Sequence, residues 1–205
     1  MNFWYWLGYT LSKIIGKLFF RYRAIHRERM IHTGPVIIAM NHQSFLDPPL
    51  GGIACDRDIY FLARKTLLDH WFWGWILPKL NVIPVNQEGA DRSALKALIR
   101  ILRAGEAALV FPEGERTLDG KLQPAQPGLG FVIAKTLAPV VPMRIFGAYE
   151  AWPRNSNKIR LHPITVVVGK PMRFTEADVT GRGKDVYQQL SQRVMDEIAK
   201  LKIDE

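Results

Sequence analysis

Two short segments of the chain combine histidine, carboxylate and arginine side chains in patterns that could do chemistry. The first segment, residues 41–47, reads NHQSFLD and places Asp47 five residues after His42. A carboxylate on one imidazole nitrogen fixes the tautomer of the ring, and the other nitrogen can then accept a proton from an alcohol. Residues five apart do not face each other on a regular helix, so the pair requires a turn between them. Taken alone, a His–Asp pair is more often a structural hydrogen bond than a catalytic dyad.

The second segment, residues 111–117, reads FPEGERT. Gly114 would allow the backbone to approach a ligand closely, and Arg116 offers a planar fork that suits a phosphate group. Glu113 could orient a donor or the substrate. The alternative is a surface turn held by a Glu–Arg pair. A third candidate, Arg64-Lys65, could bind phosphate or could be a solvated strand end.

Both segments follow stretches that read as buried strands, which is where open α/β sheets usually place their ligands. Asp47 and Pro48 form a plausible start of a helix, with Asp47 as its N-cap. Asp91 opens a second helix that Gly105 stops, and apolar positions between 186 and 201 mark a third. The expected strands are 36–40, 59–63, 81–85, 107–111, 140–146 and 164–168. This order predicts a single α/β domain with a central mixed or mostly parallel sheet flanked by helices.

The N-terminal residues 3–20 are apolar except for Thr10, Ser12 and two lysines. Lys13, Lys17 and Arg21 lie on one side of a helix, and leucine, isoleucine and phenylalanine side chains cover the other. A spanning helix needs about 20 largely uncharged residues, so we favour an amphipathic helix that lies in a membrane interface. A spanning helix and an ordinary packed helix are the alternatives. We therefore divide the chain into a membrane-associating segment, 1–30, and a main domain, 31–205.

The charge and the tryptophans of this 205-residue chain are unevenly distributed. The chain has 28 basic and 19 acidic residues, a formal net charge of +9, and residues 1–30 contribute +5 of it. Aromatic side chains beside cations are typical of a membrane surface, whereas a pI of about 9.8 also fits nucleic acid. The residues expected to contact the membrane are Trp4, Trp6, Trp71, Trp73 and Trp75. Because cations are not interleaved with the aromatics of residues 71–77, we favour membrane over nucleic acid.

Composition excludes two classes of protein. A hydrophobic content of 48% rules out a mostly disordered chain and a chain made largely of membrane spans. Cys55 is the single cysteine, so no intrachain disulfide can form and we expect no metal site.

The order of the motifs NHQSFLD, FLARK, FPEGERT and Val141-Pro142-Met143 resembles that of the lysophospholipid acyltransferases, in particular the 1-acylglycerol-3-phosphate acyltransferases. The resemblance covers about residues 30–170. It implies that His42 is a general base on the free glycerol hydroxyl, that Asp47 holds His42, and that donors near the dyad stabilise the oxyanion. It further implies substrate binding by Glu113, Gly114, Arg116, Thr117, Arg64 and Lys65, and an acyl site lined by Val141 and Pro142.

The resemblance also implies partners. Acyl-CoA or acyl-carrier protein would be the co-substrate, lysophosphatidic acid the acceptor, and no further cofactor would be needed. We expect the protein on the cytoplasmic face of a membrane, at an anionic leaflet, as a peripheral or monotopic protein.

Three positions depart from the family pattern and keep a different acceptor open. Glu115 stands where members usually carry Thr, Gln87 stands where Arg often follows an Ile-Pro-Val segment, and Gln126-Pro127-Gly128 lacks the basic residue that often precedes the glycine. A second lysolipid or an aminolipid is therefore the alternative acceptor. Two functions outside acyl transfer also stay open: a basic membrane-binding module without catalysis, and a thioesterase or hydrolase.

Overall fold

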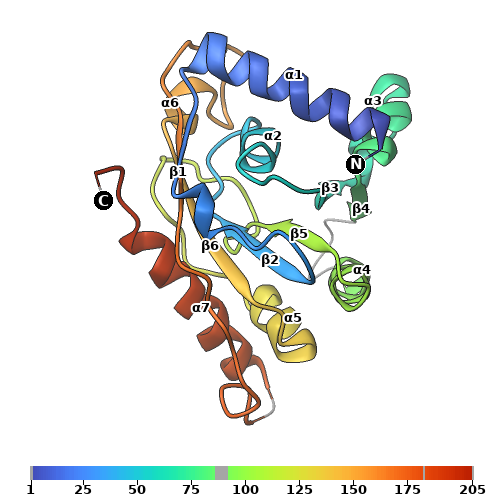
Figure 1. The fold of residues 1–205 in the computed structure, drawn as a ribbon, viewed down its shortest axis with the longest axis vertical. Helices are drawn as coiled ribbons and strands as arrows, with labels where there is room; N and C mark the ends of the chain where they lie inside the picture. Colours follow the sequence, from blue (N-terminus) through green and yellow to red (C-terminus); the bar gives the residue numbers. More distant parts are fainter. Residues whose placement is uncertain (1, 86–91, 182, 205) are drawn as a thin grey trace.

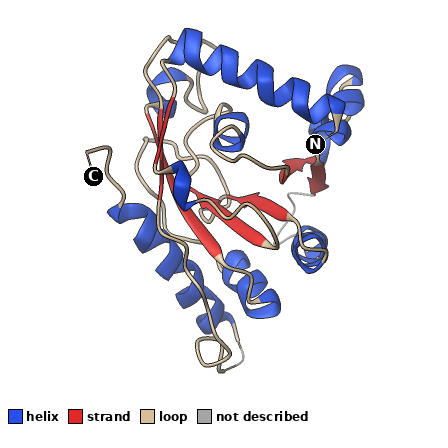
Figure 2. Ribbon diagram, in the orientation of Figure 1, coloured by secondary structure: helices blue, strands red, loops and turns tan. Residues whose placement is uncertain are grey.

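The computed structural model describes residues 2–85, 92–181 and 183–204, which form a seven-stranded sheet with helices on both faces (Figures 1 and 2). The strand order is β1-β7-β6-β2-β5-β3-β4, and every pairing is parallel except that of β6 with β7. The sheet is thus mostly parallel, which confirms the predicted fold class.

The strands of the sheet are β1 (Arg23–Ile25), β2 (Val36–Met40), β3 (Ile59–Arg64), β4 (Val82–Val85), β5 (Ala107–Val110), β6 (Val140–Phe146) and β7 (Thr165–Val168). The helices are α1 (Phe3–Phe20), α2 (Asp47–Gly52), α3 (Trp71–Ile76), α4 (Arg92–Arg103), α5 (Gly128–Thr136), α6 (Ala148–Ala151) and α7 (Lys184–Lys200). Short 3-10 helices lie at Arg27–Arg29, Lys65–Leu67 and Leu77–Leu80.

The sheet separates two hydrophobic cores because successive side chains of a strand point to opposite faces. On β2, Ile38 and Met40 pack toward α1, α2 and α6, whereas Ile37 and Ala39 pack toward α4, α5 and α7. All five residues of β2 are fully buried. A central strand buried on both faces explains the continuous apolar run that the sequence shows there.

The predicted strands agree with the structure to within one residue at each end. The short edge strand β1 was not predicted, because three residues carry too little pattern to be read as a strand. The predicted cap of α2 is wrong by one position: Asp47 is the first residue of the helix, and Leu46 precedes it as the N-cap. The predicted helix start at Asp91 lies outside the described residues.

Residues of the N-terminal segment take part in the main fold. β1 pairs with β7, and Tyr5, Phe20 and Met30 are buried in the core on the α2 side of the sheet. A Cβ on Gly16 would lie 3.3 Å from a methyl carbon of Leu50, so the small residue lets α1 approach α2 closely. Among the described residues 2–85, 92–181 and 183–204, no helix has the length and apolar character needed to cross a bilayer.

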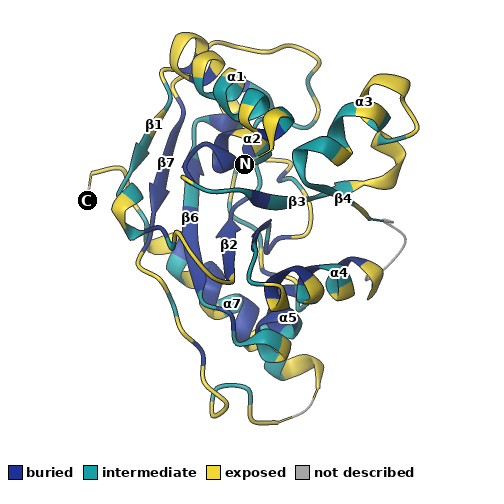
Figure 3. Cartoon of the chain, turned by 45° about the vertical axis from the view of Figure 1, so that its right-hand side comes forward, coloured by how far each residue is buried: buried dark blue, intermediate teal, exposed yellow. Residues whose placement is uncertain are grey.

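Much of the outer side of α1 is exposed (Figure 3). Large apolar side chains are among its exposed residues. Near its N-terminus the helix meets α3, where the rings of Trp4 and Trp75 contact edge to face with centroids 5.0 Å apart. The Lys79 ammonium lies 3.5 Å from the centroid of the Trp75 ring. The two tryptophan clusters that are separate in sequence therefore join in one surface. Its exposed apolar members are Phe3, Trp6, Leu11, Ile14, Ile15, Leu18, Phe19, Trp71, Phe72, Trp73 and Trp75.

Candidate active site

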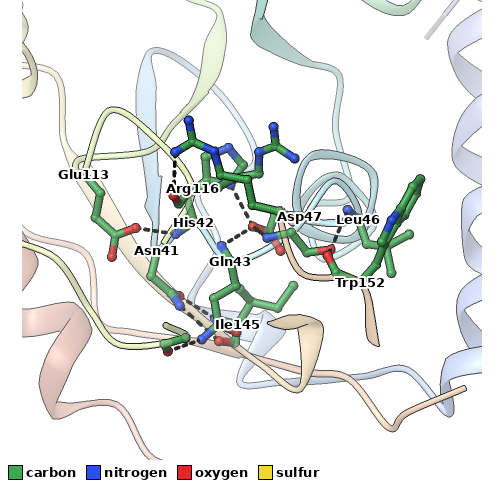
Figure 4. A network of polar contacts seen from close by, with 12 residues as sticks. Asn41, His42, Gln43, Leu46, Asp47, Glu113, Arg116, Ile145 and Trp152 are labelled. Carbon is green, nitrogen blue, oxygen red and sulfur yellow. Dashed lines mark hydrogen bonds and ion pairs between the residues drawn. The ribbon is translucent and has the colours of Figure 1, made fainter. Parts of the chain in front are cut away.

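The candidate site lies at the carboxyl ends of three adjacent parallel strands. Asn41 and His42 follow β2, Phe111 follows β5, and Arg64 ends β3. The parallel register brings these ends to one edge of the sheet, as the sequence predicted for the 41–47 and 111–117 segments. Figure 4 shows the polar network that joins the two segments there.

His42 and Asp47 form a hydrogen-bonded dyad. The Nδ1 atom of His42 lies 2.7 Å from Oδ2 of Asp47. The Asp47 side chain is fully buried, whereas 16% of the His42 side chain remains exposed. The imidazole stacks on Phe111, with centroids 3.8 Å apart and an interplanar angle of 11°. Because a carboxylate accepts and does not donate, the bond places the proton on Nδ1 and leaves the Nε2 lone pair free.

The same Asp47 oxygen closes the turn that brings the dyad together. The backbone N–H groups of Gln43 and Ser44 both donate to Oδ2, at 2.5 and 2.7 Å. The carboxylate at the start of α2 therefore caps the turn before the helix instead of the helix itself. The Ser44 hydroxyl anchors this turn by donating to the Trp152 carbonyl at 2.7 Å.

Glu113 holds the backbone of the loop at His42. Its two carboxylate oxygens accept N–H groups of His42, at 2.8 Å, and of Gln123, at 3.1 Å. The residue is only 3% exposed, and this burial raises its pKa to about 7, against the lowering effect of the two hydrogen bonds and with a small addition from the Asp47 charge. Each oxygen thus accepts one backbone N–H within the protein, and the substrate contact that the resemblance implied for Glu113 stays a prediction.

Backbone and amide hydrogen bonds join the two segments to the neighbouring strand. The Asn41 amide donates to the Ile145 carbonyl at 3.2 Å and accepts the Ile145 N–H at 2.8 Å, which ties the end of β2 to β6. The Thr117 N–H donates to the His42 carbonyl at 2.9 Å. These bonds hold the dyad on both sides.

Arg116 presents its guanidinium group beside the dyad. The group lies 3.5 Å from the centroid of the Phe45 ring, and its Nη1 is buried with no hydrogen-bond partner in the described chain. The Arg116 pKa is lowered, first by burial and then by the positive charges of Arg154 and Arg64. Cations that converge around a buried guanidinium nitrogen without a hydrogen-bond partner are typical of an anion-binding site.

Gly114, Lys65 and Thr117 are the remaining residues for which the resemblance implied substrate binding. Gly114 is exposed at the tip of the loop with a φ of +78°, a conformation that suits glycine, and Lys65 is exposed next to Arg64. Thr117 is buried, and its hydroxyl donates to Asp119 at 2.9 Å.

Val141 and Pro142 lie away from this edge. They are buried within β6, opposite Ile38 and Ala39, and therefore precede by several residues the level at which Asn41 meets Ile145. The structure does not bring them to the dyad. Gln126 lies beside Gly114, and Gln87 lies outside the described residues.

One cation at the site was missed. Arg154 follows β6 and α6, and its Nη1 donates to the Arg116 carbonyl at 3.3 Å and to Oε2 of Glu115 at 2.7 Å. The available signal was a basic residue beyond the carboxyl end of a predicted strand, the same signal that pointed to Arg64.

Comparisons of this chain with family models and with known proteins point to the same family. A family model described as acyltransferase matches residues 22–146. The chloroplastic 1-acyl-sn-glycerol-3-phosphate acyltransferases of Brassica napus and Arabidopsis thaliana are 29% and 30% identical to this chain, each over 71% of it. The alignments cover 43% and 41% of those two proteins, so the chain spans less than half of their length.

Two bacterial proteins match over more of their length. The 1-acyl-sn-glycerol-3-phosphate acyltransferase of Bacillus subtilis is 24% identical over 84% of this chain and 85% of its own. The crystal structure of the 1-acyl-sn-glycerophosphate acyltransferase from Thermotoga maritima matches 96% of this chain and 80% of that protein, with a TM-score of 0.75 and 24% identity. At this identity the structural match supports the fold.

Proposed function

Because this chain belongs to the acyltransferase family, we propose that it moves a fatty acyl group from acyl-CoA or acyl-carrier protein to the free hydroxyl of 1-acylglycerol-3-phosphate, giving phosphatidic acid. The names of the relatives support this acceptor. The observation that carries the proposal is the buried Asp47 carboxylate 2.7 Å from Nδ1 of a partly exposed His42.

The dyad suits a direct transfer without an acyl-enzyme. Nε2 of His42 takes the proton of the acceptor hydroxyl while the hydroxyl oxygen attacks the thioester carbonyl carbon. The C–S bond then breaks, and the thiolate leaves with the proton that His42 holds. Asp47 stabilises the imidazolium in between, and stacking on Phe111 keeps the ring in place.

The hydrogen-bond pattern limits which groups stabilise the oxyanion. The N–H of His42 is committed to Glu113, and those of Gln43 and Ser44 are committed to Asp47. None of these three donors is therefore available to the tetrahedral intermediate. The donors near the dyad must come from different groups at this edge or from the substrates.

The acceptor phosphate has cationic partners in Arg116 and Arg64, with the exposed Lys65 beside them. The unpaired Nη1 of Arg116 supports this placement. Gly114, at the tip of the same loop, leaves space for a headgroup. This basic edge favours lysophosphatidic acid over the alternative lysolipid or aminolipid acceptors that Gln126 suggested.

We include membrane association in the proposal. The α1–α3 surface exposes tryptophan, leucine and isoleucine side chains, and Lys17 is exposed on α1. Such a surface suits the interface of an anionic leaflet, on the cytoplasmic face where such lipids attract cations. Two cations of residues 1–30 are engaged within the protein instead: Arg27 pairs with Asp56, and Arg29 donates to the Val168 carbonyl.

The test is an acceptor and donor panel with purified protein in liposomes. Lysophosphatidic acid, lysophospholipids with larger headgroups and an aminolipid are compared at one fixed acyl donor, and then acyl-CoA is compared with acyl-carrier protein. We expect lysophosphatidic acid to be consumed fastest and His42→Ala to abolish turnover. Strict preference for a different acceptor would replace the proposed substrate, and lipid binding without turnover on any acceptor would overturn the proposed enzyme.

A further inference from the structure

Three arginines from three separate parts of the chain lie at the edge of the sheet that holds the dyad. Arg64 ends β3, Arg116 lies in the loop after β5, and Arg154 lies in the loop after α6. Arg64 and Arg154 are close enough to lower the pKa of Arg116 by their positive charge. Mutual repulsion makes this arrangement costly unless an anion offsets it.

The loop that carries Arg154 is bound directly to the turn between His42 and Asp47. Ser44 and Pro153 form an antiparallel bridge, and the Ser44 hydroxyl donates to the Trp152 carbonyl. The rings of Phe45 and Trp152 contact each other with centroids 5.0 Å apart. Arg154 is therefore held at a defined place relative to the dyad, although it is 112 residues from His42 in the sequence.

Glu115 holds Arg154 without using all of its donors. The ion pair and the bond to the Arg116 carbonyl both involve Nη1, so Nη2 and Nε make no hydrogen bond within the described chain. Glu115 occupies the position where family members usually carry threonine. Because the exposed Lys65 lies next to Arg64, the cations at this edge outnumber this one carboxylate, and the positive balance suits a phosphate monoester of nearly −2 at pH 7.

We propose that Arg154, held by Glu115, is a specificity-determining residue that binds the phosphate monoester of the acceptor together with Arg116 and Arg64. The inference rests on the proposed function. It explains how the chain recognises a dianionic headgroup although Gln126 replaces an expected cation. Diester headgroups, with a single negative charge, neutralise less of this positive charge and bind less well.

The test measures KM and kcat for Arg154→Ala with lysophosphatidic acid, with a lysophosphatidylglycerol and with neutral monoacylglycerol. Because the variant loses a hydrogen bond to a charged group, we expect KM for lysophosphatidic acid to rise about 10- to 100-fold. Values of kcat stay within about threefold, and KM for monoacylglycerol does not change. Arg154→Lys retains the charge and should give a smaller rise.

Arg160→Ala is the matched control, because Arg160 is an exposed arginine on the same segment whose side chain makes no hydrogen bond or ion pair within the described chain. A KM for lysophosphatidic acid that rises no more in Arg154→Ala than in Arg160→Ala would overturn the inference, as would equal rises for charged and neutral acceptors. If the wild-type protein acylates none of the acceptors, the proposed function fails, and calorimetric binding of glycerol 3-phosphate decides the inference. Weaker binding by Arg154→Ala supports it, and equal binding overturns it.

Discussion

The Nδ1 atom of His42 lies 2.7 Å from Oδ2 of Asp47, and the same oxygen accepts the backbone N–H groups of Gln43 and Ser44. One buried carboxylate oxygen therefore both orients the imidazole and closes the turn that brings it within reach. The geometry of the dyad and the local fold depend on the same atom. A substitution at Asp47 must for this reason affect both, whereas a substitution at His42 leaves the two backbone hydrogen bonds of the turn in place.

His42→Ala should lower kcat for acyl transfer by about 10²- to 10⁴-fold, the range that a general base contributes. Its melting temperature should fall less than that of an Asp47 variant, because the imidazole makes one hydrogen bond, to Asp47, and one ring contact, with Phe111, whereas Asp47 holds the whole turn. Asp47→Asn should lower kcat by a similar factor and also lower the melting temperature. For each variant, single-turnover assays measure the rate of acyl transfer and thermal unfolding measures the melting temperature. An active His42→Ala protein would exclude the proposed mechanism.

Glu113 makes stability depend on pH. Its pKa of about 7 in the folded protein exceeds its ordinary value of 4.5, because the carboxyl is buried. The folded state thus holds a proton that the unfolded state has already lost. The contribution of Glu113 to stability is fully present below pH 4.5 and decreases as pH rises through 7. Glu113→Gln lacks this ionisation but loses one N–H acceptor, at a cost of about 1–3 kcal/mol.

The stability difference between wild type and Glu113→Gln should therefore be largest near pH 4.5 and should narrow by about pH 8. Denaturant unfolding at a series of pH values measures it. Glu150→Gln, at an exposed position, serves as the control and should show no comparable trend. A difference that grows with pH would show that the carboxylate form is the one the fold favours.

The dyad could be predicted from the sequence because both residues lie in one loop whose turn is required by their spacing. The strands could be predicted because β2, buried on both faces, is a continuous apolar run. The hydrogen-bond partners of Glu113 could not be predicted from the sequence, since its bond to His42 joins residues 71 apart. Arg154 was not predicted for the same reason, because only tertiary contacts bring it to the site: the bridge of the neighbouring Pro153 with Ser44, and its own ion pair with Glu115.

The packing of α1 is a second feature that could not be predicted from the sequence. The periodicity of residues 3–20 predicted a helix, and the structure has α1 there. The sequence pattern did not reveal that Tyr5 and Phe20 are the residues buried against the domain, because a helix that is apolar on most sides offers more than one face for packing. The meeting of Trp4 with Trp75 likewise depends on how α1 and α3 pack.

Gly114→Ala should impair the acceptor site and lower stability. A φ of +78° costs a residue with a Cβ about 1–2 kcal/mol, and the added Cβ would lie 3.1 Å from Cγ of Gln126. We expect a lower melting temperature and a higher KM for lysophosphatidic acid. The double variant Gly114→Ala/Gln126→Ala should recover the stability that is lost to the Cβ contact, but not the stability that is lost to the positive φ. If Gly114→Ala alone is as stable and active as the wild type, the loop tolerates a side chain at this position.

Membrane binding should depend on the exposed tryptophans of α3. Trp71 is 81% exposed and Trp73 44%, so the double variant Trp71→Ala/Trp73→Ala removes apolar surface without opening the core. Burial of a large side chain contributes about 1.5–3 kcal/mol, and even partial burial of two predicts a loss of at least about tenfold in liposome partitioning. Flotation with anionic and neutral vesicles measures this, with Ile203→Ala as a control at an exposed apolar side chain near the C-terminus. Thermal unfolding should not change, because both indoles are exposed. Unchanged flotation of the double variant, with Ile203→Ala also unchanged, would place the membrane contact elsewhere than on α3.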